Sequence, residues 1–200
     1  MLFNSATSQD PAGLANSSGM LGKYLMTHFA GAGASGELPD LVEQPSMGKP
    51  NRPCGLVTPR FRNLPGGPAS AGFLRGYAFS TSVGAGVNLA APGFGDAYKQ
   101  AVRQPRPATL SFAGFGECLP YADNTCTVDR NVVDAFGIPV VRLHLTPREN
   151  ERALQRDMAT HAAEILDRIG ATRIRQTFGM RGQAHEVGAA RMGTDPKSSV

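Results

Sequence analysis

Glycine and proline together occupy almost a fifth of this 200-residue chain. Glycine is conformationally free and proline lacks an amide hydrogen, so a chain rich in both is expected to form many turns and short strands around few helices. The apolar fraction of 41% and the charged fraction of 18% are still those of a folded protein. The apolar runs fall well short of the ~18 residues that span a bilayer, so no transmembrane segment is predicted.

Residues 146–170 have the one strong helical pattern in the chain. Thr146 and Glu149 match a capping box with Pro147 at the first helical position, and Gly170 supplies a C-terminal stop. His161 lies beside the apolar stripe, where a structural role is favoured over a catalytic one. The stripe is predicted from apolar residues that recur every three to four positions: Leu154, Met158, Ala162, Ile165, Leu166 and Ile169.

Strand patterns lie on both sides of this helix. Apolar alternation and β-branched residues predict strands at 73–79, 108–117, 125–129, 138–145 and 172–178. Strands that precede and follow a single long helix favour an α+β fold, with a mostly antiparallel sheet backed by helices.

The glycine-rich region 29–56 is predicted to be an extended loop. Within it, Gly31–Gly36 matches the GxGxxG string of dinucleotide-binding folds. That motif requires a helix to follow and an acidic residue about 20 positions later. Pro39 opposes a helix here, and residues 51–60 contain no acid, so a loop is favoured over a nucleotide site.

The cysteines and the charge distribution limit the other possibilities. The three cysteines, Cys54, Cys118 and Cys126, form no CxxC pair, which excludes a closed disulfide framework and a four-thiolate zinc site; no metal site is predicted.

Eight basic residues and only one acid, Asp96, lie between positions 49 and 106. This span would attract an anion such as an acidic sugar, although a solvated basic face is the favoured interpretation. No nucleic-acid-binding motif accompanies the charge.

Two segments carry a resemblance to a known family. His185–Gly193, which reads HEVGAARMG, continues into Thr194–Val200 and resembles the C-terminal motif of glucose–methanol–choline (GMC) flavoprotein oxidoreductases, with Ala189 in place of the usual threonine. Asn16–Gly19 and Gly22–His28 resemble a second segment of the same family. Further stretches resemble landmarks of its bacterial branch of gluconate, sorbitol and fructose dehydrogenase-like flavoproteins: Pro59–Asn63, Gly114–Pro120 and Asn150.

The resemblance implies an organisation of interleaved domains. Residues 1–28 would be the tail of a Rossmann-type FAD-binding segment, 29–180 a substrate-binding domain, and 181–200 the return toward the FAD-binding domain. The glycine-rich ADP-binding motif and the closing segment with the usual catalytic pair have no counterpart in the chain. We therefore expect a fragment that is inactive in isolation.

The resemblance also implies chemistry: FAD-dependent oxidation of the CH–OH group of an alcohol, sugar or sugar acid, with hydride transfer from the substrate carbon to the flavin. His185 is the candidate base, because histidine exchanges protons near neutral pH. The rival interpretation is that His185 packs structurally and orients its loop. Asn16, Ser17, His28 and Arg191 are the candidate cofactor-binding residues.

The implied partners are a small-molecule alcohol or sugar and a cytochrome or other electron-acceptor subunit. Two alternatives stay open: a non-catalytic module that binds an anionic sugar, and a degenerate fragment without a function. No signal peptide is visible at the N-terminus, and the sequence leaves the compartment open.

Overall fold

The computed structural model describes residues 1–43, 55–66, 72–85, 88–179 and 185–200. The chain divides into two compact units. Unit 1 contains Met1–His28, Glu117–Glu149 and Gln183–Val200, and unit 2 contains Phe29–Gly116 and Asn150–Gly182. Residues 117–149, which the sequence analysis placed in the substrate-binding domain, thus pack with the two terminal segments. The assignment of either unit to a flavin or a substrate domain stays a prediction.

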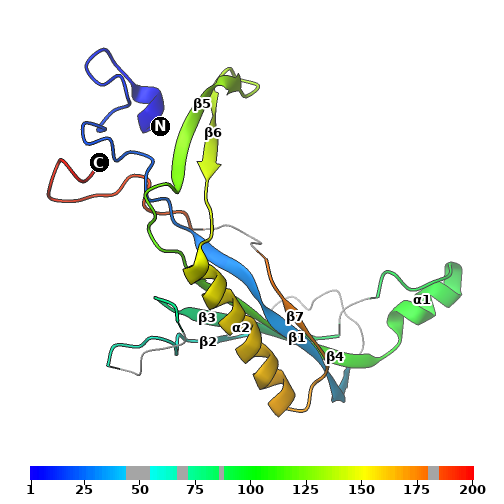
Figure 1. Cartoon of the computed structure of the whole chain (residues 1–200). Helices are drawn as coiled ribbons and strands as arrows, with labels where there is room; N and C mark the ends of the chain where they lie inside the picture. The colour runs from blue at the N-terminus through cyan, green and yellow to red at the C-terminus, as the bar shows by residue number, and fades with distance from the viewer. Residues whose placement is uncertain (44–54, 67–71, 86–87, 180–184) are drawn as a thin grey trace. The chain divides into compact units, whose positions relative to one another are not determined.

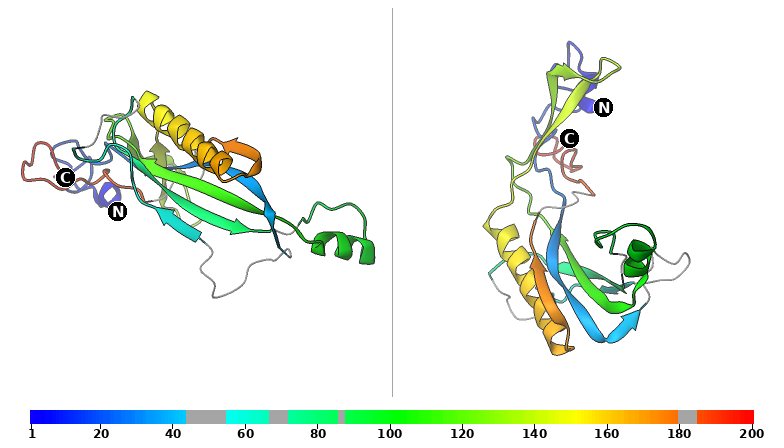
Figure 2. Two further views of the ribbon diagram at one scale, coloured as in Figure 1. Left: turned by 90° about the horizontal axis from the view of Figure 1, so that it is seen from below. Right: turned by 90° about the vertical axis from the view of Figure 1, so that its right-hand side faces the viewer.

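Unit 2 is built on a five-stranded sheet backed by a long helix. In the order of the sheet, its strands are β2 (Gly55–Thr58), β3 (Tyr77–Gly84), β4 (Arg106–Glu117), β1 (His28–Glu43) and β7 (Thr172–Thr177). The pairs β2–β3, β3–β4 and β1–β7 are antiparallel. Helix α2 (Glu149–Arg168) lies along one face of the sheet (Figure 1). Helix α1 (Gly95–Arg103) projects beyond one end of the strands (Figure 2). The α+β prediction with a mostly antiparallel sheet is confirmed.

The core of unit 2 forms where α2 meets glycines of β4. Gly116 lies opposite Tyr77 and Gly114 opposite Phe79 in the β3–β4 register. A Cβ added to Gly114 would lie 2.7 Å from the sulfur of Met158, and one added to Gly116 would lie 2.7 Å from a methyl carbon of Leu154. The side chains of α2 therefore occupy the space that side chains on β4 would need. The buried cluster is Ala32, Ala34, Phe73, Tyr77, Phe79, Leu154, Met158, Ala162, Leu166 and Ala171.

Unit 1 contains a short 3₁₀ helix (Leu2–Ser5) and a two-stranded antiparallel sheet of β5 (Thr125–Val133) and β6 (Pro139–His144). The fully buried Asn124 joins three of its segments. The Asn124 carbonyl accepts the amide hydrogen of Leu25 at 2.9 Å, its Oδ1 accepts that of Thr146 at 3.0 Å, and its Nδ2 lies 3.9 Å from the Cys118 sulfur. One amide side chain thus organises the region where the hairpin begins and ends.

Most of the predicted elements are present. β4, β5, β6 and β7 lie at or within a few residues of their predicted positions. Leu154, Met158, Ala162 and Leu166 are buried on α2 as expected, although Ile169 is about half exposed. Gly170 has a φ of 77° and its amide donates to Asp167, as expected of a C-terminal stop. Neither described helix has the length and hydropathy needed to cross a bilayer.

The predicted loop at 29–56 is wrong where the structure describes it. Residues 29–43 belong to β1, and 55–58 form β2; residues 44–54 lie outside the described part. The GxGxxG string of Gly31–Gly36 therefore lies within a strand. Its glycines permit close approach rather than a turn, because a Cβ on Gly33 would lie 1.9 Å from the Phe112 carbonyl oxygen of β4.

Two further predictions need correction. The expected strand at 73–79 begins only at Tyr77, because Arg75 has a left-handed φ of 72° that breaks extended structure. The expected capping box does not start the helix. α2 begins at Glu149, and the amide of Thr146 donates to Asn124. The Thr146 amide, which the capping box would pair with the Glu149 carboxylate, is thus paired with the Asn124 side chain.

We predict that Gly33→Ala destabilises the chain by at least about 2 kcal/mol, because the new methyl group overlaps a backbone carbonyl that cannot rotate away. Gly84→Ala is the matched control, since Gly84 also lies in the sheet and its added Cβ has no neighbour within 4 Å. That control should leave stability unchanged or raise it by up to ~1 kcal/mol. Urea unfolding measures both; equal stabilities would contradict the tight β1–β4 approach.

Candidate functional site

The two segments that resemble the flavoprotein family lie side by side in unit 1. The amide of Val187 donates to the carbonyl of Met26 at 3.0 Å, and the amide of Met26 donates back at 2.8 Å. The amide of Gly22 donates to the carbonyl of Ala189 at 2.7 Å. An isolated antiparallel bridge at Met26–Val187 and one further backbone hydrogen bond thus join residues 22–28 to residues 185–189, about 160 positions away in the sequence; this pairing is called the ladder below.

Gly188 makes this ladder possible. Its φ is +96°, and a Cβ at this position would lie 2.0 Å from the carbonyl oxygen of Tyr24. Tyr24 itself has a left-handed φ of 59°. The Met26–Val187 and Gly22–Ala189 bonds differ in register by two residues, so the chain bulges between them. A side chain at position 188 would overlap the backbone of the bulged residues at Tyr24.

The ladder brings two candidate site residues together. Continuing the Met26–Val187 register by two residues places His28 opposite His185. The two imidazole rings meet edge to face, with their centroids 5.0 Å apart and their planes at 87°. His28 is half-buried at the start of β1, whereas His185 is exposed and has a left-handed φ of 61°. A half-buried ring thus lies against an exposed ring that solutes can reach.

The other three candidates lie on loops of unit 1. Asn16 donates from Nδ2 to the Ala12 carbonyl, and its Oδ1 accepts the amide hydrogen of Leu21, each at 3.0 Å. Ser17 is exposed. The Arg191 guanidinium lies 4.8 Å from the centroid of the Tyr24 ring and donates to the Ser198 carbonyl at 2.8 Å. These contacts organise loops, and a cofactor-binding role for the three residues stays a prediction.

A pocket of about 490 Å³ opens beside the ladder, beginning one residue after His185. Its volume falls within the usual range for small-molecule sites, and its walls are mainly apolar. The β5–β6 hairpin contributes Cys126 and Leu143 to this pocket, which the sequence alone does not predict, because nothing in it indicates which strand face turns toward residues 186–190. The lining residues are Leu25, Cys126, Leu143, Glu186, Val187, Gly188, Ala189 and Ala190.

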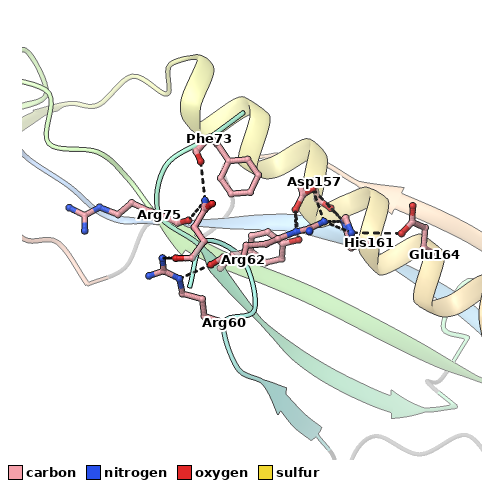
Figure 3. Close-up of polar contacts among 9 residues, drawn as sticks. Arg60, Arg62, Phe73, Arg75, Asp157, His161 and Glu164 are labelled. Carbon is pink, nitrogen blue, oxygen red and sulfur yellow. Dashed lines mark hydrogen bonds and ion pairs between the residues drawn. The ribbon is translucent and has the colours of Figure 1, made fainter. Parts of the chain in front are cut away.

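A second polar cluster lies in unit 2, where Arg62 reaches from its loop to α2 (Figure 3). Its Nε donates to Asp157 at 2.9 Å, and its Nη2 donates to the other carboxylate oxygen at 3.2 Å. The Tyr77 hydroxyl donates to the same carboxylate at 2.6 Å. Arg62 also contacts His161, whose Nδ1 lies 3.0 Å from the Asp157 carbonyl. The cluster joins loop, strand and helix.

The electrostatics of this cluster match a structural role. Burial raises the pKa of the Tyr77 phenol, and its hydrogen bond to Asp157 raises it further. Burial alone would lower the pKa of Arg62, but the hydrogen bonds to Asp157 and Tyr77 and the charge of Asp157 raise it overall. Both groups thus keep their protons across the physiological range, which suits a fixed tether better than a proton carrier.

The neighbouring loop is held by amide side chains. Asn63 donates from Nδ2 to the carbonyls of Phe73 and Arg75, at 2.9 and 2.7 Å, and Asn150 accepts the amide hydrogen of Leu74 at 2.7 Å. Arg60 donates to the carbonyls of Arg62 and Asn63 (Figure 3). Residues 59–63 and Asn150, two of the stretches with a resemblance to the flavoprotein family, thus contact one loop. Arg60 and Arg62 of the basic span are thus engaged in the loop and on α2, whereas Lys49 and Arg52 lie outside the described residues.

Comparison with known proteins finds similarity to a 2-methyl-1,2-propanediol dehydrogenase of Mycolicibacterium austroafricanum. The two sequences are 29% identical over 213 aligned positions, which cover all of this chain and 37% of the relative. The chain therefore spans little more than a third of that protein's length. No family model matches the chain.

The cluster around Asp157 predicts how stability depends on pH. Because the pKa of Tyr77 is raised above its unfolded value of about 10, the stability it supplies is complete below that pH and is lost as the pH rises through the folded pKa. Tyr77→Phe should cost about 1–3 kcal/mol at neutral pH, and this difference from the wild type should shrink above pH 10.

Denaturant unfolding between pH 7 and 12 measures this difference. Tyr98→Phe is the control, because its hydroxyl donates to the Leu89 carbonyl at an exposed position. It should change stability by less than about 1 kcal/mol at neutral pH. A Tyr77→Phe difference that stays constant up to pH 12 would contradict the assignment.

We predict that Gly188→Ala opens the ladder between residues 22–28 and 185–189. The new Cβ would overlap the Tyr24 carbonyl and would also require an unfavourable φ. Gly137→Ala is the matched control, since Gly137 has a φ of +77° in the same unit but open space around it. Hydrogen exchange at the Met26 and Val187 amides should accelerate at least tenfold in the first variant only. Similar acceleration in both variants would contradict the role of close approach, because it would mean that the positive φ alone accounts for the need for glycine at position 188.

Proposed function

We propose that this chain is part of an FAD-dependent oxidoreductase of the GMC family that acts on a CH–OH group. Two observations support the proposal. A relative named as a diol dehydrogenase aligns with the whole chain. The two segments with family resemblance, far apart in the sequence, pair so that their histidines His28 and His185 meet. The second observation is the stronger support, because it shows that the two segments with the resemblance are neighbours in the folded chain.

The residues of unit 1 suit one part of FAD. The apolar pocket beside the ladder has the size and lining for a planar ring system such as the flavin's. The described residues offer no counterpart to a phosphate-binding glycine loop, because Gly31–Gly36 lies in β1 and no helix begins there. We therefore propose that the pocket borders the flavin ring and that residues other than those described hold the ADP half.

His185 is the proposed base. Its imidazole is exposed, so an alcohol can reach it, and a neutral ring nitrogen can accept the proton of the substrate hydroxyl. The O–H bond breaks toward that nitrogen while the adjacent carbon loses hydride and becomes a carbonyl carbon. FAD, when bound, supplies the hydride acceptor. Leu25 and Leu143 contribute apolar side chains to the pocket that begins one residue after this histidine.

The substrate class follows from the same pocket. Its lining contains one carboxylate, Glu186, and otherwise no charged side chain. A neutral alcohol or diol fits such walls better than a sugar acid, whose carboxylate would meet Glu186 and lose its hydration. Within the proposed family, a small neutral alcohol is therefore the preferred donor over gluconate-like acids.

The test uses the whole protein that contains this chain, because the chain covers only 37% of its relative's length. The purified protein should contain flavin, and anaerobic 2-methyl-1,2-propanediol or a related small alcohol should bleach its visible absorbance. His185→Gln should slow this bleaching by about 10²- to 10⁴-fold, the range for loss of a general base. His144→Gln is the matched control, because His144 is an exposed histidine in the same unit.

Three outcomes would contradict the proposal. A full-length protein that binds no flavin would contradict the proposed cofactor. Equal rates of bleaching in His185→Gln and His144→Gln would contradict the role of His185 as the base. Stoichiometric FAD on the 200-residue chain alone would show that the ADP half does not need other residues.

A further inference from the structure

The edge-to-face contact of the two histidines assigns a role to His28 that the motifs alone do not. We propose that His28 is a positioning residue: its ring fixes the orientation of the His185 imidazole, so that one ring nitrogen of His185 stays directed at the substrate hydroxyl. This inference rests on the proposed function, because it requires that His185 act as the base. In this proposal His185 reacts with the substrate, and His28 only holds the His185 ring in place.

The surroundings of the two rings differ in a way that sets the direction of this effect. His28 begins the 16-residue strand β1 and follows Thr27, which is buried, and Met26, which makes both hydrogen bonds to Val187. His185 is exposed and has a left-handed φ, a conformation that neighbours must hold in place for a residue other than glycine. The anchored ring therefore orients the exposed one.

The geometry accounts for why an aromatic ring is needed at position 28. Rings at 5.0 Å with planes at 87° make the edge-to-face contact that aromatic pairs prefer. Among the described residues, this ring contact restricts rotation of the His185 side chain without a hydrogen bond from it, which leaves both nitrogens of His185 accessible to a substrate. Phenylalanine at 28 can keep this contact, whereas alanine cannot.

The Met26–Val187 bonds keep the two rings in register. Both bonds lie two residues from the histidines, and the period of two in extended chains places the histidine pair on the same face as the Met26–Val187 pair. Cross-strand neighbours on one face of an antiparallel pair are within contact distance, so backbone pairing brings the rings together before their own attraction contributes. The positioning device is therefore the ladder together with the His28 ring.

The first test is structural and needs no cofactor. In the 200-residue chain labelled at histidine, NMR compares the ring-proton shifts of His185 in wild type, His28→Phe and His28→Ala. A neighbouring ring shifts these protons, so His28→Phe should keep a displaced resonance and His28→Ala should move it toward the value of free histidine. His144→Ala is the control and should leave the His185 resonances unchanged. Equal His185 shifts in wild type and His28→Ala would overturn the contact.

The second test measures catalysis in the full-length flavin-containing protein. His28→Ala should lower kcat by about 10- to 100-fold, as expected when a reacting group is misplaced, with KM for the alcohol changed less than threefold. His28→Phe should restore kcat to within about fivefold of the wild type. An unchanged kcat in His28→Ala would overturn the positioning role, and so would a failure of His28→Phe to restore it.

The two proposals fail in distinguishable ways. If His185→Gln retains full activity, the proposed base is wrong whatever His28 does. If His185→Gln is inactive while His28→Ala is fully active and still folded by its NMR spectrum, the proposed function stands and only the positioning role is overturned.

Discussion

Close approach of backbones at glycine is the constraint on which both units depend. In unit 2, Gly33 lets β1 and β4 come together at Phe112, and Gly114 and Gly116 let Leu154 and Met158 of α2 settle on the sheet. In unit 1, Gly188 lets its segment approach Tyr24. At each of these positions a Cβ would lie less than 3 Å from a neighbouring atom. The high glycine content thus serves packing as well as turns.

This use of glycine explains which sequence predictions failed. The region 29–56 was predicted as a loop because glycine usually marks turns, yet Gly33 and Gly36 lie in a strand whose neighbours press against them. The strand at 73–79 was placed too early because Arg75 breaks it with a left-handed φ, held by loop contacts from Asn63. In both cases tertiary contacts overrode local propensity, and a single sequence does not contain those contacts.

The predictions that succeeded rest on local physics. The stripe of α2 follows from a 3.6-residue period, and β6 follows from a dense run of β-branched residues. The site was only partly accessible to such reasoning. His185 and His28 were singled out by motif, but their meeting depends on a ladder with a bulge at Tyr24, which shifts the register by two residues. The pocket could not be predicted, because it needs Cys126 and Leu143 from a hairpin whose facing surface is set only by folding.

The contacts of Asp157 in unit 2 and of the His28–His185 pair in unit 1 decide which of the two groups is the better candidate for catalysis. Asp157 accepts hydrogen bonds from Arg62 and Tyr77, and the raised pKa of Tyr77 keeps that phenol protonated. A carboxylate that accepts three hydrogen bonds in this way has little capacity left for a substrate, and replacing either donor would remove part of the compensation of a partly buried charge. His185, in contrast, is exposed and touches its neighbour through a ring contact that leaves its nitrogens able to exchange protons. Chemistry requires a group that is held in place and still able to react, and in the described part of the chain the paired histidines of unit 1 meet that requirement better than the saturated cluster of unit 2.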